Sequence, residues 1–193
     1  MTHEDLVTSD SVKALWKYFQ KKYKTKLIKK SDSQLMKTTS KVLDRRGYMD
    51  KQSFMNDYYT TVCIGPRRVI YTPSCSSIGN GNFDALVQDI EDACHEFTHV
   101  RQKNGIKYLL NSGVMTRAET TAYLTNQEIQ HYLIGQLYND KALADMLIPY
   151  GATGKDTKYA VQKYKTARSM ISRGYYKQKT VLQAIAFLEK YGK

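Results

Sequence analysis

The chain has 193 residues, of which 41% are hydrophobic, and this is enough for one packed domain or for two small lobes around one cleft. It contains no apolar run of about 18 residues, which excludes a membrane-spanning helix. A total of 30 basic against 18 acidic residues gives a net charge of +12, which favours anionic partners such as nucleic acid or cell-wall polymers but identifies none of them.

The N-terminal part predicts short helices and strands. Residues 12–23 and 31–43 carry apolar side chains at helical spacing, and Ser9 or Asp10 is expected to cap the first helix. Residues 26–30 alternate as in a strand, and the β-rich runs 58–64 and 69–72 are joined by a glycine-proline turn, which predicts a hairpin.

Three cysteines, Cys63, Cys75 and Cys94, form no metal-binding pattern. Reduced thiols are the simplest interpretation, while a Cys63–Cys75 disulfide across the hairpin stays open. Cys94 is expected to be a small buried hydrophobic residue rather than a ligand.

A long amphipathic helix is predicted from about Asn82 to Lys103, because apolar residues recur there at spacings of three and four. This helix contains the sequence His-Glu-Phe-Thr-His, a match to the zinc-binding pattern H-E-x-x-H, and its two histidines lie on the face opposite the apolar stripe. Residues i and i+4 share a face, so His95 and His99 can offer two imidazole nitrogens to one metal, with Glu96 beside them as a proton acceptor. The alternative is a solvated helix with two surface histidines.

The remainder of the chain predicts helices only. They are expected over about 117–137 after a cap at Thr116, over 142–148, over 157–172 and over 179–190. The whole pattern indicates a single α+β domain, with a small mixed or antiparallel sheet and helices in an N-terminal lobe of about residues 1–104. A mostly helical C-terminal lobe is expected over about 105–193.

A third metal ligand is needed, since a catalytic zinc has three protein ligands and one open position. Glu119 lies 20 residues after His99, which lets the chain reverse and bring a second helix against the first. His131 would lie about 18 Å farther along that helix and cannot share the site. Glu119 has another interpretation, a capping box with Thr116. Glu128 and His131 are expected to be ordinary surface residues of the helix.

The HEFTH sequence followed by a helical glutamate at this spacing resembles the gluzincin branch of the zincin metallopeptidases, of which thermolysin is the familiar member. HEFTHVRQ is also similar to stretches found in small bacterial and phage-encoded zincins. The resemblance covers roughly residues 69–133 and implies a zincin-like fold with its active-site cleft between the two lobes. It implies one zinc per chain bound by His95, His99 and Glu119, and Glu96 as the general base. It also implies that strand 69–72 is the sheet edge along which a substrate peptide lies.

The chain departs from this family at Tyr123, where gluzincins often have an acidic residue that orients a ligand histidine. That role is expected to fall to the Tyr123 hydroxyl or to Asp92. The group that stabilises the oxyanion stays open among Tyr108, Tyr123 and Arg117.

These features predict a zinc-dependent metallopeptidase with a polypeptide substrate, located in the cytoplasm or carried in a phage particle and without a signal peptide. Three alternatives stay open. One is an amidase of cell-wall peptide, and a second is a protease tethered to nucleic acid through the lysines of 13–30 and 155–179. The third is a non-catalytic zincin-fold protein that binds nucleic acid or serves in a virion.

Overall fold

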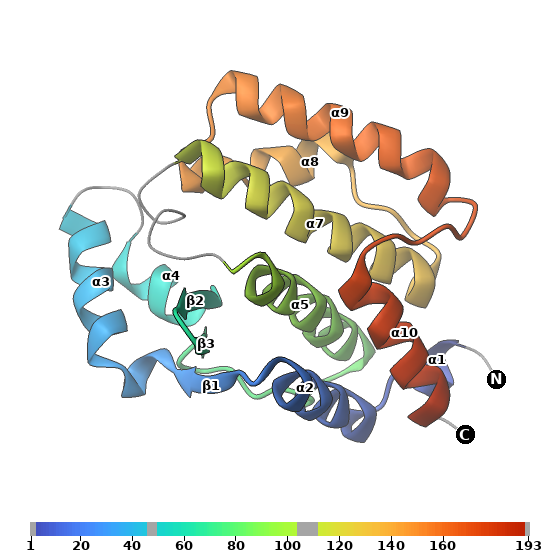
Figure 1. Ribbon diagram of the computed structural model, residues 1–193, viewed down its shortest axis with the longest axis horizontal. Helices are drawn as coiled ribbons and strands as arrows, with labels where there is room; N and C mark the ends of the chain where they lie inside the picture. The colour runs from blue at the N-terminus through green and yellow to red at the C-terminus, as the bar shows by residue number, and fades with distance from the viewer. Residues whose placement is uncertain (1–2, 46–49, 104–111, 192–193) are drawn as a thin grey trace.

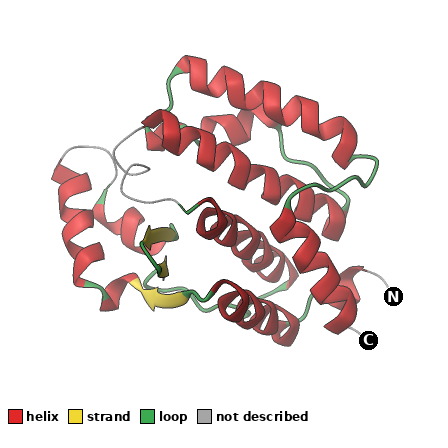
Figure 2. Ribbon diagram, viewed as in Figure 1, coloured by secondary structure: helices red, strands yellow, loops and turns green. Residues whose placement is uncertain are grey.

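The computed structural model describes residues 3–45, 50–103 and 112–191 (Figure 1). The candidate residue Tyr108 lies outside these ranges. The helices are α1 (His3–Leu6), α2 (Ser9–Tyr23), α3 (Gln34–Arg45), α4 (Lys51–Asn56), α5 (Phe83–Gln102), α7 (Ser112–Ile134), α8 (Asp140–Asp145), α9 (Gly154–Ile171) and α10 (Lys179–Tyr191), with single 3-10 turns η1 (Lys30–Asp32) and η2 (Ile148–Tyr150). The strands are β1 (Lys26–Lys29), β2 (Thr60–Ile64) and β3 (Arg67–Thr72). The predicted α+β class and the mostly helical C-terminal part are confirmed (Figure 2).

The three strands form one small mixed sheet in the order β1-β3-β2. β2 and β3 make the predicted antiparallel hairpin, and Gly65 supplies the positive φ of +55° in its turn. β1 pairs with β3 in parallel, with Lys26 opposite Val69. The expectation that residues 69–72 form a sheet edge is therefore wrong, because β1 covers that side of β3. The edges of the sheet are β1 and β2.

Helix α5 lies at the centre of the molecule. Figure 1 shows α9, α7, α5 and α2 stacked in that order, with the sheet, α3 and α4 at one end. The apolar stripe of α5 packs against α2, where Phe97 meets Phe19 at a ring-centroid distance of 5.0 Å and Trp16 at 5.7 Å. All three side chains are almost fully buried. This packing fixes the rotation of α5 and so directs the opposite face, with the two histidines, toward α7.

The main core takes residues from both halves of the chain. Val100 of α5, Ile129 of α7 and Val181 of α10 belong to one buried cluster with the apolar residues of α2. A second cluster, which includes Leu147 and Tyr164, joins α8 and α9 to the outer side of α7. Within the described residues, no helix is long and apolar enough to cross a membrane.

Several local predictions need correction. The N-cap of α2 is Thr8, whose hydroxyl accepts a hydrogen bond from the Ser11 backbone in a capping box, rather than Ser9 or Asp10. Helix α4, capped by Asp50, was not predicted because it has only six residues and no clear apolar period. Helix α7 begins at Ser112, so Thr116 lies inside the helix and does not cap it. All three cysteines are free thiols, and Cys94 is buried as expected.

Candidate metal centre

Helix α5 carries the two histidines one turn apart on its α7-facing side. It begins and ends within one residue of the predicted limits, with Asn82 as the N-cap and Lys103 in the left-handed conformation as the C-cap. The His99 side chain is only 4% exposed and that of His95 only 12%. The interpretation of two solvated surface histidines is therefore wrong, because α7 covers the face that carries them.

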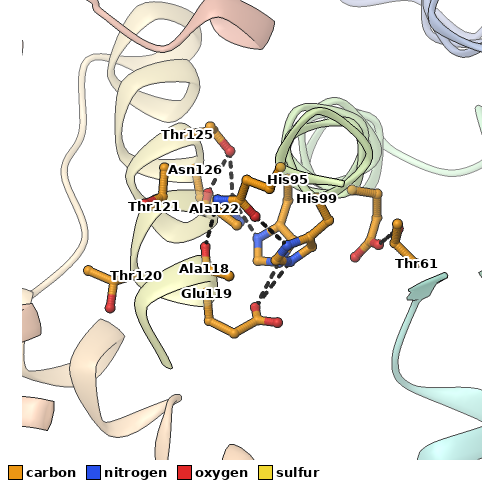
Figure 3. A network of polar contacts seen from close by, with 12 residues as sticks. Thr61, His95, His99, Ala118, Glu119, Thr120, Thr121, Ala122, Thr125 and Asn126 are labelled. Atoms are coloured by element: carbon orange, nitrogen blue, oxygen red, sulfur yellow. Dashed lines mark hydrogen bonds and ion pairs between the residues drawn. The ribbon is translucent and has the colours of Figure 1, made fainter. Parts of the chain in front are cut away.

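Three ligand atoms converge between α5 and α7 (Figure 3). Nε2 of His95 lies 3.1 Å from Nε2 of His99, and Oε2 of Glu119 lies 3.2 Å and 3.3 Å from these two nitrogens. The carboxylate of Glu119 therefore points at the two imidazoles. The capping-box interpretation of this residue is wrong, since Thr116 is in the helix interior.

These three distances match the ligand spacing of a tetrahedral zinc site. With metal–ligand bonds of about 2.0–2.1 Å, neighbouring ligand atoms of a tetrahedron are about 3.3 Å apart. The structure has 3.1, 3.2 and 3.3 Å. The spacing of the three donors therefore fits one face of such a tetrahedron.

The far nitrogen of each imidazole is oriented by an amide side chain. Nδ1 of His95 lies 3.2 Å from Oδ1 of Asn126, and Nδ1 of His99 lies 3.0 Å from Oε1 of Gln102. The orientation of each amide follows from its other bonds. Asn126 donates through Nδ2 to Glu91, at 3.4 Å, and Gln102 donates through Nε2 to the carbonyl oxygen of Ala118, at 3.2 Å.

This arrangement determines which nitrogen of each histidine can bind a metal. An amide oxygen only accepts hydrogen bonds, so Nδ1 of both rings must carry a proton. In the neutral imidazole Nε2 is then bare, and the two bare nitrogens and a carboxylate oxygen point at one another. Their lone pairs repel unless a cation lies among them, which is the arrangement that metal-binding histidines require.

The pKa shifts of His99 and Glu119 also indicate that a cation is needed among the three converging atoms. Burial lowers the pKa of His99, but the Glu119 carboxylate outweighs burial and raises this pKa to about 9. Burial likewise raises the pKa of Glu119, but the charge of His99 and the hydrogen bonds from both histidines hold it well below its usual range. Without a metal, a proton on His99 is thus the cation that compensates the buried carboxylate.

Glu96 points away from α7, toward the sheet. Its Oε2 accepts a 2.6 Å hydrogen bond from Oγ1 of Thr61, and the Glu96 side chain is buried. Thr61 belongs to β2, the edge strand beside α5. The hydrogen bond from β2 fixes the orientation of this carboxylate.

A second buried carboxylate extends the network behind His95. Oε2 of Glu91 accepts a hydrogen bond from the Tyr138 hydroxyl at 2.7 Å as well as the one from Asn126. Burial raises the pKa of Glu91 to about 8. Three side chains from α5, from α7 and from the loop before α8 thereby orient the His95 imidazole.

The other sequence candidates are distributed as follows. Tyr123 is buried with its ring edge-on to His95, at 4.9 Å between centroids, and its hydroxyl is hydrogen-bonded with Tyr150. The expectation that Tyr123 or Asp92 orients a ligand histidine is wrong, since amides fill that role and Asp92 accepts from Gln88. Arg117 is exposed on α7.

The two downstream candidates on α7 have structural contacts away from the triad. His131 is hydrogen-bonded through Nδ1 with the Tyr176 hydroxyl at 2.9 Å. Glu128 is buried and accepts the backbone N–H groups of Lys177 and Gln178, at 3.0 Å and 2.8 Å, just before α10. The expectation of a surface position for Glu128 is therefore wrong.

Four residues around the site are not predicted from the sequence: Thr61, Gln102, Asn126 and Tyr138. A sequence signal exists for two of them. Gln102 follows His99 by three residues and Asn126 follows Glu119 by seven, so each shares a helix face with a proposed ligand. Thr61 and Tyr138 reach the site through tertiary contacts that have no local signature.

Comparison with protein-family models, with curated proteins and with solved structures finds no match to the chain.

Proposed function

We propose that the protein is a zinc-dependent metallopeptidase in which His95, His99 and Glu119 bind the metal. The observation that carries the proposal is the convergence of the three ligand atoms at 3.1–3.3 Å. Two imidazoles and one carboxylate are a donor set typical of catalytic zinc, whereas magnesium and calcium prefer oxygen ligands throughout. Two nitrogens held in the metal-binding tautomer by Asn126 and Gln102 further support this assignment.

Zinc in such a site is a Lewis acid that polarises a carbonyl group and lowers the pKa of coordinated water. The chain supplies the proton transfers. Glu96 accepts a proton from the attacking water and returns it to the departing amine nitrogen as the peptide C–N bond breaks. Thr61 holds one carboxylate oxygen of Glu96 at 2.6 Å, so that the carboxylate is oriented before substrate binds.

The sheet supports an extended polypeptide as the substrate. Strand β2 is an edge strand, and its residue Thr61 contacts Glu96 directly. An extended chain that adds to the free edge of β2 lies next to the proposed base, with its backbone hydrogen-bonded to the protein. This replaces strand 69–72, which has partners on both sides, as the proposed substrate edge.

A purely structural metal site is less compatible with this arrangement. Structural zinc sites are closed by four protein ligands, and they have no use for a buried carboxylate next to the ligands. The grouping of His95, His99 and Glu119 supplies three ligands, and Glu96 is oriented toward β2 rather than toward α7.

The experiment combines metal analysis with a peptide-library assay. Protein purified without chelator should contain about one zinc per chain and should cleave members of the library. The Glu96→Gln variant should retain zinc and fold but lose hydrolysis. Protein that refuses added zinc would overturn the metal assignment, and undiminished cleavage by Glu96→Gln would show that Glu96 is not the base. A zinc-loaded parent that cleaves no peptide would favour the non-catalytic alternative.

A further inference from the structure

Helix α9 carries a basic face that the proposed metal centre does not use. Between Asp156 and Glu189 the sequence contains seven lysine and arginine residues and no acidic residue. The inner side of α9 buries Ala160, Tyr164 and Ile171. The lysines on the exposed surface of the helix are Lys155, Lys158, Lys163 and Lys165.

The one acidic residue of α9 does not neutralise these lysines. The carboxylate of Asp156 accepts hydrogen bonds from the backbone N–H and the hydroxyl of Thr153, at 2.8 Å and 2.6 Å, in the capping box that starts the helix. Across residues 3–45, 50–103 and 112–191, no ion pair involves an exposed lysine of α9. The positive charge of this face is therefore available to a partner.

A groove of about 960 Å³ lies beside this face, between α8 and α9. Its two acidic residues are already paired, Asp140 with Arg168 at 2.8 Å and Asp145 with Lys141 at 2.5 Å. Lys158 and Lys165 also line the groove, which leaves it with uncompensated positive charge. A concave groove with net positive charge suits an extended anion better than a flat, solvated surface of the same charge does.

An exposed aromatic ring lies among the lysines. Tyr159 is 45% exposed, and the ammonium group of Lys163 lies 5.5 Å from the centroid of its ring. An exposed ring flanked by ammonium groups is the combination that binds single-stranded nucleic acid, because a base stacks on the ring while the phosphates contact the lysines. A duplex could use only the lysines, since its bases are already stacked.

We propose that the groove between α8 and α9, together with the outer face of α9, binds single-stranded nucleic acid. Lys158 and Lys165 contact phosphates in the groove, and Tyr159 stacks on a base. From Lys155 to Lys165 the helix rises by about 15 Å, which suits a short segment of strand. The proposal does not depend on the metal centre and can be tested separately from it.

The test measures the fluorescence anisotropy of a labelled oligothymidine of about 20 nucleotides. The parent should bind it with an affinity that falls steeply as NaCl is raised. The double reversal Lys158→Glu/Lys165→Glu should weaken binding by about tenfold or more at low salt. The matched control is Lys17→Glu/Lys21→Glu on α2, which reverses two exposed lysines and changes the net charge equally. It should change the affinity by about twofold at most.

A second comparison separates nucleic acid from other polyanions. Tyr159→Leu should weaken oligothymidine binding by about fivefold or more and leave the binding of heparin, which has no bases, unchanged. Absence of binding by the parent at low salt would overturn the proposal, as would equal losses for the two double reversals. The single-strand assignment would be overturned if Tyr159→Leu bound oligothymidine as tightly as the parent and heparin or duplex competed as well as single strands. The surface would then bind polyanions in general.

Discussion

Glu119 and Asn126 contact opposite nitrogens of one imidazole ring. Oε2 of Glu119 lies 3.2 Å from Nε2 of His95, and Oδ1 of Asn126 lies 3.2 Å from Nδ1 of the same ring. The two residues are seven positions apart on α7 and therefore share a face two turns apart. Helix α7 thus supplies both a proposed ligand and the group that orients another ligand.

The first prediction concerns Asn126. Asn126→Leu removes the acceptor for Nδ1–H of His95, so zinc affinity should fall by roughly 10–100-fold. Asn126→Asp is the matched control, because it retains an acceptor oxygen at nearly the same place. Competition with a chromophoric chelator measures both affinities. Equal, parent-like affinities for the two variants would show that Asn126 does not orient the ligand.

The second prediction compares Glu119 with His131. Glu119→Ala removes one of the three converging atoms and should weaken zinc binding by far more than tenfold. His131→Ala should leave zinc binding unchanged, since that side chain is bonded with Tyr176 rather than with the triad. Zinc titration of both variants, with helix content followed by circular dichroism, checks the pair. The reverse result would replace the proposed ligand set with a three-histidine site.

The sequence was informative where local periodicity determines structure. Helix α5 was predicted within a residue at each end, because Leu86, Ile90 and Phe97 mark a continuous apolar stripe between clear caps. The strands were also predicted, since residues 26–30 alternate as in a strand and two β-rich runs flank a glycine-proline turn. The order of strands in the sheet was not predictable, because pairing of β1 with β3 joins segments about forty residues apart by contacts that no local pattern encodes.

The groups around the proposed ligands were harder to predict than the ligands. Glu119 was found because its spacing from His99 allows a chain reversal. Thr61 and Tyr138 were missed because their roles follow from a sheet edge and a loop that pack against α5 only in the folded chain. Glu128 was expected at the surface because an acid on a helix is usually solvated, yet here it is buried and accepts the backbone N–H groups of Lys177 and Gln178 just before α10.

A third prediction follows from the pKa shifts of His99 and Glu119 in metal-free protein. The pKa of His99 is raised to about 9, so its contribution to stability is complete below its usual value of 6.5 and is lost as the pH rises through about 9. The pKa of Glu119 is lowered, so its contribution is present above its usual 4.5 and is lost as the pH falls. The pair therefore stabilises the protein most between these two usual values.

Urea unfolding in EDTA measures this dependence. Between pH 6 and pH 9 the metal-free parent should lose stability, and Glu119→Gln should lose much less over the same interval, because its His99 has no carboxylate partner. A parent and variant with parallel pH profiles would contradict the coupling of the two groups.

Zinc binding should also release protons, because a histidine must be neutral to bind the metal. With the pKa of His99 raised to about 9, this residue is protonated in metal-free protein at pH 7.5. Titration calorimetry in two buffers with different ionisation enthalpies should give a release of about one proton per zinc. Glu119→Gln should release fewer, and an unchanged heat in the two buffers would contradict a protonated His99.

The last prediction concerns Thr61, the hydrogen-bond donor to the proposed base. Thr61→Val keeps the shape of the side chain but removes the hydroxyl that donates to Glu96 Oε2 at 2.6 Å. The Glu96 carboxylate is buried, so loss of this donor should leave it poorly oriented. With a library peptide that the parent cleaves, kcat should fall by roughly tenfold or more. Zinc content should be unchanged, because Thr61 contacts none of the three proposed ligands.

Thr61→Ser retains the hydroxyl and should keep most of the activity. If Thr61→Val is as active as Thr61→Ser, Thr61 does not position the base, whereas a loss of zinc in both variants would give β2 a structural role at the metal centre.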